Sequence, residues 1–184
     1  IYIYKDKSYR LPRHGFARDS EFEIIRHEKQ HAAFLLKDTP HSLKNYPFTF
    51  ELLVDYFLDN EILKVTYEVR NIGADDMYFS IGGHPAFKLP LTKEALYEDY
   101  FLEFEAVENA GHWPISKDGL IGQIPVPFFI NSSRIDLSHQ LFENDALVFK
   151  DLHSNKVSLR TSRNDHGLEF YFERFPFLGF LAAK

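Results

Sequence analysis

The chain has 184 residues, 16% of them aromatic, and a formal net charge of −6 with acidic and basic side chains interspersed. This length suffices for one domain with a sizeable hydrophobic core, and the lack of a basic stripe argues against a nucleic-acid partner. Cysteine is absent, which excludes disulfides, thiolate nucleophiles and cysteine-ligated metals and is compatible with a reducing compartment such as the cytoplasm.

The N-terminal third predicts short strands at residues 1–4, 22–25 and 33–36, followed by a regular hairpin. In the hairpin, apolar side chains recur at every second position over 48–58 and again over 63–69, with polar residues on the opposite face of the second segment. This alternation is typical of half-buried antiparallel strands. The Asp-Asn pair at positions 59 and 60 suits a tight turn between them.

Downstream of the hairpin the pattern stays β-rich. Further strands are predicted at residues 77–81, 100–104, 146–149, 157–160, 168–172 and in the C-terminal run 177–184. Helical pattern is scarce and amounts to a turn or two at 92–97 and 138–144. The proline-broken stretch 111–134 is expected to be a long excursion or short edge strands. Closely spaced strands separated by Gly, Pro, Asn and Asp favour an antiparallel β-sandwich.

No internal repeat, linker or low-complexity segment divides the sequence, so residues 1–184 are predicted to form a single domain. The first residue is Ile1 within a strand pattern, and the last strand pattern has no polar tail. We therefore expect a fragment that lacks strands at both ends. The first residues do not have the pattern of a signal peptide, and no apolar run approaches the ~20 residues that cross a bilayer, so a membrane partner is not expected.

His84 is the first candidate for chemistry. It lies in Gly82-Gly83-His84-Pro85, where the glycines permit a tight turn or a close approach to a ligand and the proline favours extended backbone at the histidine. Because histidine exchanges protons near neutral pH, an imidazole held in a fixed direction suits acid–base catalysis. The alternative is a turn in which the ring only caps a backbone carbonyl.

His14 and Asp145 are further candidates. His14 lies in the string Arg-His-Gly-Phe-Ala-Arg that ends at Arg18, and its imidazole could meet that of His84 across one pocket. The alternative is a loop histidine beside solvated arginines. Asp145 opens the predicted strand 146–149, where a carboxylate can bind a hydroxyl group or simply serve the turn.

The sequence lacks the motifs of several other classes of enzyme and binding protein. No glycine-rich phosphate loop precedes a helix, and the Gly-x-Ser-x-Gly string of a serine hydrolase is absent. His27 and His31 have the spacing of helical metal ligands, but their surroundings predict a strand, a turn and a strand, so no metal site is expected. Most of the other histidines are expected at the surface.

Three strings, in this order along the chain, resemble the aldose 1-epimerase (galactose mutarotase) family and its LacX-like branch. They are Arg-His-Gly-Phe-Ala-Arg (13–18), Ile-Gly-Gly-His-Pro-Ala-Phe (81–87) and Asn-Asp-Ala-Leu-Val-Phe (144–149). The resemblance runs over essentially the whole chain. It implies a galactose mutarotase-like supersandwich, here incomplete. It also implies interconversion of the α and β anomers of a small-molecule sugar without a metal or organic cofactor.

The same resemblance implies roles for the candidate residues. His84 matches the general acid that protonates the ring oxygen, and His14 matches the second histidine, which hydrogen-bonds the sugar. Asp145 matches a carboxylate that holds sugar hydroxyls, and Arg18 lines the pocket. The family's base is a glutamate in a Glu-Pro-Trp-like segment that follows a strand such as 175–180, and this chain ends before it. These 184 residues alone are therefore expected to be poorly folded and inactive, and the parent protein active.

An alternative stays open, in which the same sandwich holds or senses a carbohydrate without turnover. The nearest carboxylates to the expected base, Glu169 and Glu173, each fit an ordinary strand position. Galactose, glucose, tagatose-pathway sugars and hexose phosphates are all open as substrates, and the sequence leaves the oligomeric state open.

Overall fold

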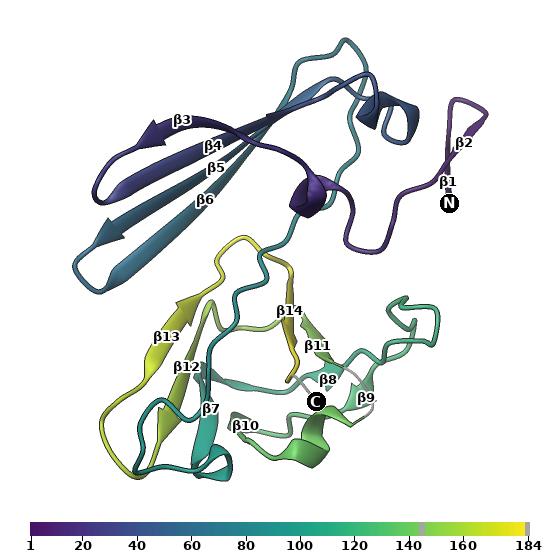
Figure 1. Cartoon of the computed structure of the whole chain (residues 1–184). Helices are drawn as coiled ribbons and strands as arrows, with labels where there is room; N and C mark the ends of the chain where they lie inside the picture. Colours follow the sequence, from purple (N-terminus) through teal and green to yellow (C-terminus); the bar gives the residue numbers. More distant parts are fainter. Residues whose placement is uncertain (144–145, 183–184) are drawn as a thin grey trace. The chain divides into compact units, whose positions relative to one another are not determined.

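The computed structural model describes residues 1–143 and 146–182, which form two compact units within Ile1–Ile81 and Gly82–Lys184 (Figure 1). Every strand pairing among the described residues is antiparallel, and their helical elements are four short 3₁₀ turns. The predicted all-β, antiparallel fold class is therefore confirmed. The single domain over 1–184 stays a prediction.

Unit 1 consists of a small hairpin and a four-stranded sheet. The hairpin pairs β1 (Tyr2–Tyr4) with β2 (Lys7–Tyr9). The sheet has the order β3-β4-β5-β6 and comprises β3 (Glu23–His27), β4 (His31–Lys37), β5 (Phe50–Asp59) and β6 (Ile62–Asn71). Two 3₁₀ turns, η1 (Ala17–Asp19) and η2 (Ser42–Lys44), lie in the connections.

The predicted hairpin forms between β5 and β6, but its turn lies one residue later than expected. Asp59 pairs with Ile62, so the two-residue loop is Asn60 and Glu61. Asn60 has φ +52°, in the left-handed region that a hairpin turn requires and that asparagine tolerates better than most residues. The conformational preference of Asn60 therefore fixes the register of the hairpin.

One face of the sheet carries the core of unit 1, called the β5 cluster below. Its buried members are Leu36, Tyr46, Phe48, Phe50, Leu52 and Val54. Side chains from the connections cover this face, among them Phe16, Phe22, Met77 and Ile81. The period-two pattern of β5 thus places its apolar residues under a layer of loop residues. Packing against the cluster fixes these loop residues in position.

Residues 77–81 were predicted to be a strand, and this prediction is wrong. The segment belongs to no strand of the described chain. Met77 and Ile81 pack against the β5 cluster, whereas Tyr78 and Phe79 are mostly exposed. The apolar pattern at 77–81 therefore reflects the packing of two side chains. It does not indicate a strand, because a strand also needs a neighbouring backbone with which to exchange hydrogen bonds.

Unit 2 contains a second four-stranded sheet, in the order β10-β7-β12-β13, and two short strand pairs, β11-β14 and β8-β9 (Figure 1). Its strands are β7 (Tyr100–Glu108), β8 (Gly111–His112), β9 (Val126–Pro127), β10 (Ser132–Asp136), β11 (Leu147–Lys150), β12 (Lys156–Thr161), β13 (Leu168–Tyr171) and β14 (Phe177–Phe180). The strands predicted in this region are present, and the C-terminal one covers 177–180 of the predicted 177–184, of which positions 183 and 184 lie outside the described residues. Two 3₁₀ turns, η3 (Tyr97–Asp99) and η4 (His139–Phe142), fall at or near the expected helical turns.

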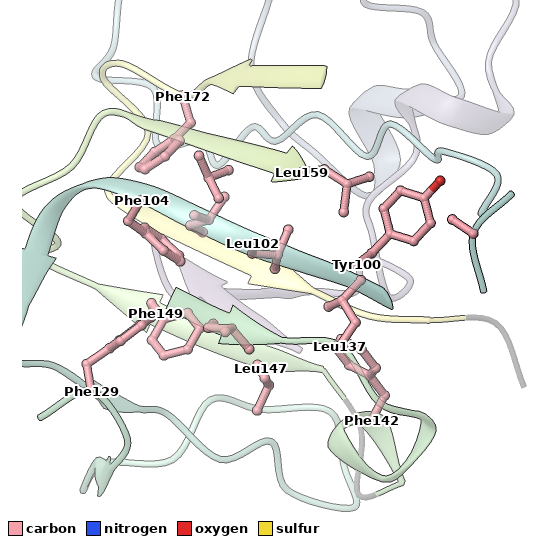
Figure 2. Close-up of a cluster of buried hydrophobic side chains, with 14 residues drawn as sticks. Tyr100, Leu102, Phe104, Phe129, Leu137, Phe142, Leu147, Phe149, Leu159 and Phe172 are labelled. Carbon is pink, nitrogen blue, oxygen red and sulfur yellow. The ribbon is translucent and has the colours of Figure 1, made fainter. Parts of the chain in front are cut away.

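The four-stranded sheet and the β11-β14 pair enclose the core of unit 2 (Figure 2). Phe104 of β7 contacts Phe129 with ring centroids 5.1 Å apart, and Phe129 contacts Phe149 of β11 at the same distance. Phe149 is fully buried. Phe180 of β14 also packs against Phe104, with ring centroids 6.1 Å apart. Much of the high aromatic content is therefore core, as the strand patterns indicated.

The proline-rich stretch 111–134 is a long excursion with short edge strands, as predicted. β8 and β9 pair over two residues each, and an isolated bridge joins Ile115 to Ile121. Pro127 lies within β9 and Pro125 just before it, positions that keep each strand short because proline donates no hydrogen bond.

Candidate functional site

His14 lies in a tight turn of unit 1 and not in a strand. The backbone N–H of Gly15 donates to the carbonyl of Pro12 at 3.0 Å, which closes the turn around Arg13 and His14. His14 has φ +70°, and its side chain is exposed. A residue with a Cβ in this left-handed region is strained by roughly 1–2 kcal/mol.

Phe16 anchors the turn to the β5 cluster. Its ring lies 5.5 Å from that of Tyr46 and 5.8 Å from that of Phe50, centroid to centroid. The backbone after it is also fixed, because the Ser20 hydroxyl donates to the Phe16 carbonyl at 2.9 Å. The imidazole of His14 is therefore two residues from a packed, hydrogen-bonded anchor.

His84 follows the segment 77–81 and lies in the exposed stretch 82–88 of unit 2, which belongs to no strand. Its side chain is exposed, as are those of Pro85 and Phe87. Gly82 and Gly83 form no turn, so of the two roles that the sequence left open for them the tight turn is absent, and a close approach to a ligand stays a prediction.

The segments that lead to both histidines pack against the same cluster. Phe16, two residues after His14, and Ile81, three residues before His84, both lie against the β5 cluster. Tyr46 of that cluster also donates its hydroxyl to the carbonyl of Tyr78 at 2.9 Å. His14 belongs to unit 1 and His84 to unit 2, so the convergence of the two rings stays a prediction.

Arg18 and Asp145 were predicted to bind substrate. Arg18 lies in η1 with an exposed guanidinium, 3.6 Å from the carboxylate of its neighbour Asp19. This exposed pair contributes little to stability and leaves the guanidinium available to a ligand. Asp145 lies outside the described residues. The roles of both residues stay predictions.

Glu169 is engaged in ion pairs on the outer face of β13. Its carboxylate accepts hydrogen bonds from Lys156 and from the Tyr171 hydroxyl, each at 3.0 Å. These bonds, that from Lys156 above all, hold the pKa of Glu169 below its ordinary value. A general base at neutral pH is favoured by a raised pKa, so Glu169 is a poor candidate, as its strand position indicated. Glu173 is simply exposed.

Glu108 is a buried carboxylate that the sequence reasoning missed. It is 1% exposed and accepts hydrogen bonds from the backbone N–H groups of His153 and Ser154, at 3.1 and 2.9 Å, and from the Ser154 hydroxyl at 2.7 Å. Burial raises the pKa of Glu108, but these hydrogen bonds outweigh burial and hold it below its ordinary value. The alternation of side chains along β7 could have located it, because Glu108 has the same even-numbered position as the buried residues of that strand. These are Tyr100, Leu102 and Phe104.

Two searches of the described residues give negative results. No three histidine, aspartate or glutamate side chains gather closely enough to hold a metal ion. In the same part of the chain, no helix is long and apolar enough to cross a membrane. His27 and His31 lie on the consecutive strands β3 and β4, in the arrangement that the sequence predicted.

Comparison with known proteins points to one family. The sequence profile of the aldose 1-epimerase family matches residues 2–183. Protein LacX of Lactococcus lactis subsp. lactis, in its plasmid and chromosomal forms, is 36% identical over 169 residues, which are 90% of this chain. The match covers 56% of LacX, so the chain spans little more than half the length of these curated relatives.

Solved structures with the same fold come from two Lactobacillus species. The galactose mutarotase related enzyme of Lactobacillus acidophilus matches 97% of this chain and 59% of its own, with 38% identity and a TM-score of 0.88. A galactose mutarotase-like protein of Lactobacillus casei matches 98% of this chain and 62% of its own, with 27% identity and a TM-score of 0.83. The predicted galactose mutarotase-like fold is therefore confirmed.

The left-handed backbone at His14 generates a stability prediction. We expect His14→Gly to be more stable than His14→Ala by about 1 kcal/mol, because glycine adopts φ +70° without the clash that any Cβ brings. Urea unfolding of both variants measures the difference. Equal stabilities, or a more stable alanine variant, would show that the turn relaxes in solution and that His14 is not strained.

The buried carboxylate of Glu108 generates a pH-dependent prediction. Since its folded pKa is lowered from 4.5, its stabilising contribution is complete above that value and is lost as the pH falls through the folded pKa. We expect Glu108→Gln to lower the free energy of unfolding by about 1–3 kcal/mol at pH 7. The deficit should shrink toward pH 3 in urea titrations. A deficit independent of pH would contradict this role.

Proposed function

Because the chain belongs to the aldose 1-epimerase family, in its LacX-like branch, we propose that the parent protein interconverts the α and β anomers of a hexose. The reaction is an acid–base ring opening and closure that requires no metal or organic cofactor. A free sugar in the cytoplasm is the proposed substrate. The activity is proposed for the whole protein, since the chain spans 56% of LacX.

One observation supports this proposal beyond family membership. The turn that carries His14 and the segment that leads to His84 are both held by the β5 cluster, through Phe16 and through Ile81. The support is limited to unit 1, where the His14 turn and residues 77–81, the segment that leads to His84, pack on one cluster. The exposure of both imidazoles supports access for a soluble substrate.

In the proposed mechanism, His84 donates a proton to the ring oxygen as the C1–O5 bond breaks. A carboxylate removes the proton of the C1 hydroxyl, and the aldehyde forms. The C1–C2 bond rotates, the O5 hydroxyl attacks the other face of the carbonyl, and the proton transfers run in reverse. His14 hydrogen-bonds the sugar and polarises it. Each well-placed acid or base of this kind contributes roughly 10²–10⁴-fold.

The base is proposed to be a glutamate carried by the parent protein outside these 184 residues. Two of the described carboxylates support this assignment by being engaged elsewhere. Glu169 is paired with Lys156, and Glu108 is saturated by donors from His153 and Ser154. Arg18 and Asp145 are proposed to hold the sugar hydroxyls, because a neutral substrate offers mainly hydroxyl groups to a binding site.

Polarimetry on the full-length protein tests the proposal. Fresh α-galactose and α-glucose should lose their optical rotation faster with the protein than in buffer. His84→Asn should remove the general acid and lower kcat by about 10²-fold or more. His14→Asn should raise KM as well as lower kcat, because its ring also binds the sugar.

His27→Asn is the matched control, since His27 is an exposed histidine of unit 1 on β3. It should leave kcat and KM unchanged. A fully active His84→Asn variant would refute the assignment of the acid. A wild-type protein that binds the sugar but does not accelerate mutarotation would instead support the alternative, a carbohydrate-binding sandwich without turnover.

A further inference from the structure

We propose that Tyr46 is a positioning residue that fixes, within unit 1, both the turn that carries His14 and residues 77–81, the segment that leads to His84. The inference rests on the proposed function, since it assigns the role of Tyr46 through His14 and His84. Tyr46 lies between η2 and β5, is 8% exposed and belongs to the β5 cluster. It does not contact the sugar in this proposal and acts through its two partners.

The ring of Tyr46 holds the His14 turn. It contacts Phe16 with a centroid separation of 5.5 Å and an interplanar angle of 47°. Phe48 and Phe50, at 4.8 and 5.7 Å, hold the Tyr46 ring from the sheet side. Aromatic pairs at these distances contribute beyond the area that they bury. A movement of the Tyr46 ring would therefore move Phe16 and the turn that precedes it.

The hydroxyl of Tyr46 holds the segment that leads to His84. It donates to the carbonyl of Tyr78 at 2.9 Å, in a stretch that forms no strand and so has no ladder to support its backbone. Burial, and next the neighbouring Tyr2, raise the pKa of Tyr46 to about 12. The hydroxyl is therefore protonated at physiological pH and remains a donor.

Chain length makes this anchoring relevant to both imidazoles. An extended chain spans at most about 3.6 Å per residue, so the Cα atom of His84 lies within roughly 11 Å of that of Ile81, three residues away. The Cα atom of His14 lies within about 7 Å of that of Phe16 by the same rule. Both anchors pack on the cluster that contains Tyr46, so this one side chain can constrain both segments.

The test compares Tyr46→Phe with Tyr2→Phe in the full-length protein. Tyr2 is a matched control because its hydroxyl also donates to a backbone carbonyl of unit 1, that of Asn45, at the same 2.9 Å. Tyr46→Phe keeps the ring and its contact with Phe16 but removes the bond to Tyr78. We expect it to lower kcat by about tenfold with KM within about twofold, whereas Tyr2→Phe should change neither.

Histidine NMR signals provide a readout that does not depend on activity. Tyr46→Phe should shift or broaden the imidazole signals of His84 and leave those of His14 in place, because only the Tyr78 bond is lost. Phe16→Leu should do the converse and disturb His14. Thermal unfolding confirms that each variant is folded at the temperature of the measurements, so that a loss of rate cannot come from unfolded protein.

The outcomes separate this inference from the proposed function. If the wild-type protein does not accelerate mutarotation, the proposed function fails, and the NMR signals alone decide whether Tyr46 positions His84. If the wild-type protein is active, the inference requires both the loss of kcat and the change at His84 in Tyr46→Phe. Equal behaviour of Tyr46→Phe and Tyr2→Phe, or either change without the other, would overturn it.

Discussion

Burial of aromatic and aliphatic side chains on one face of β5 is the constraint on which the candidate site depends. Loops at a protein surface are ordinarily its most mobile parts. Here two of them are fixed because Phe16 and Ile81 pack against the β5 cluster. Full burial of one such side chain stabilises by about 1.5–3 kcal/mol, and Phe16 and Ile81, which are partly buried, gain a fraction of that. The cluster thus serves as the core of unit 1 and as the support of both histidine segments.

In this arrangement the sheet and the loops have different roles. β5 supplies rigidity, and the exposed segments supply His14 and His84, whose own backbones are irregular. The left-handed φ of His14 costs stability, which the neighbouring packing of Phe16 offsets. Glu108 shows the opposite case, a carboxylate so fully hydrogen-bonded that it stabilises a turn and has no capacity left for catalysis.

The sequence predicted what depends on local patterns. Period-two alternation located β5 and β6, and the phase of β7 could have located Glu108 on its inward face. The prediction of a strand at 77–81 failed because an apolar run does not reveal whether a partner strand exists. The role of Tyr46 was out of reach for the same reason, since its partners Phe16 and Tyr78 lie about 30 residues away in either direction. The histidine strings indicated the family, but which side chains support them depends on tertiary contacts.

The central claim is that His14 and His84 act on one sugar molecule. Titration of the full-length protein with galactose or glucose, followed by the imidazole NMR signals, tests it most directly. We expect the signals of His14 and His84 to shift together and to saturate at one sugar concentration, while those of His27 stay fixed. Shifts at only one of the two histidines, or two different saturation points, would contradict the claim.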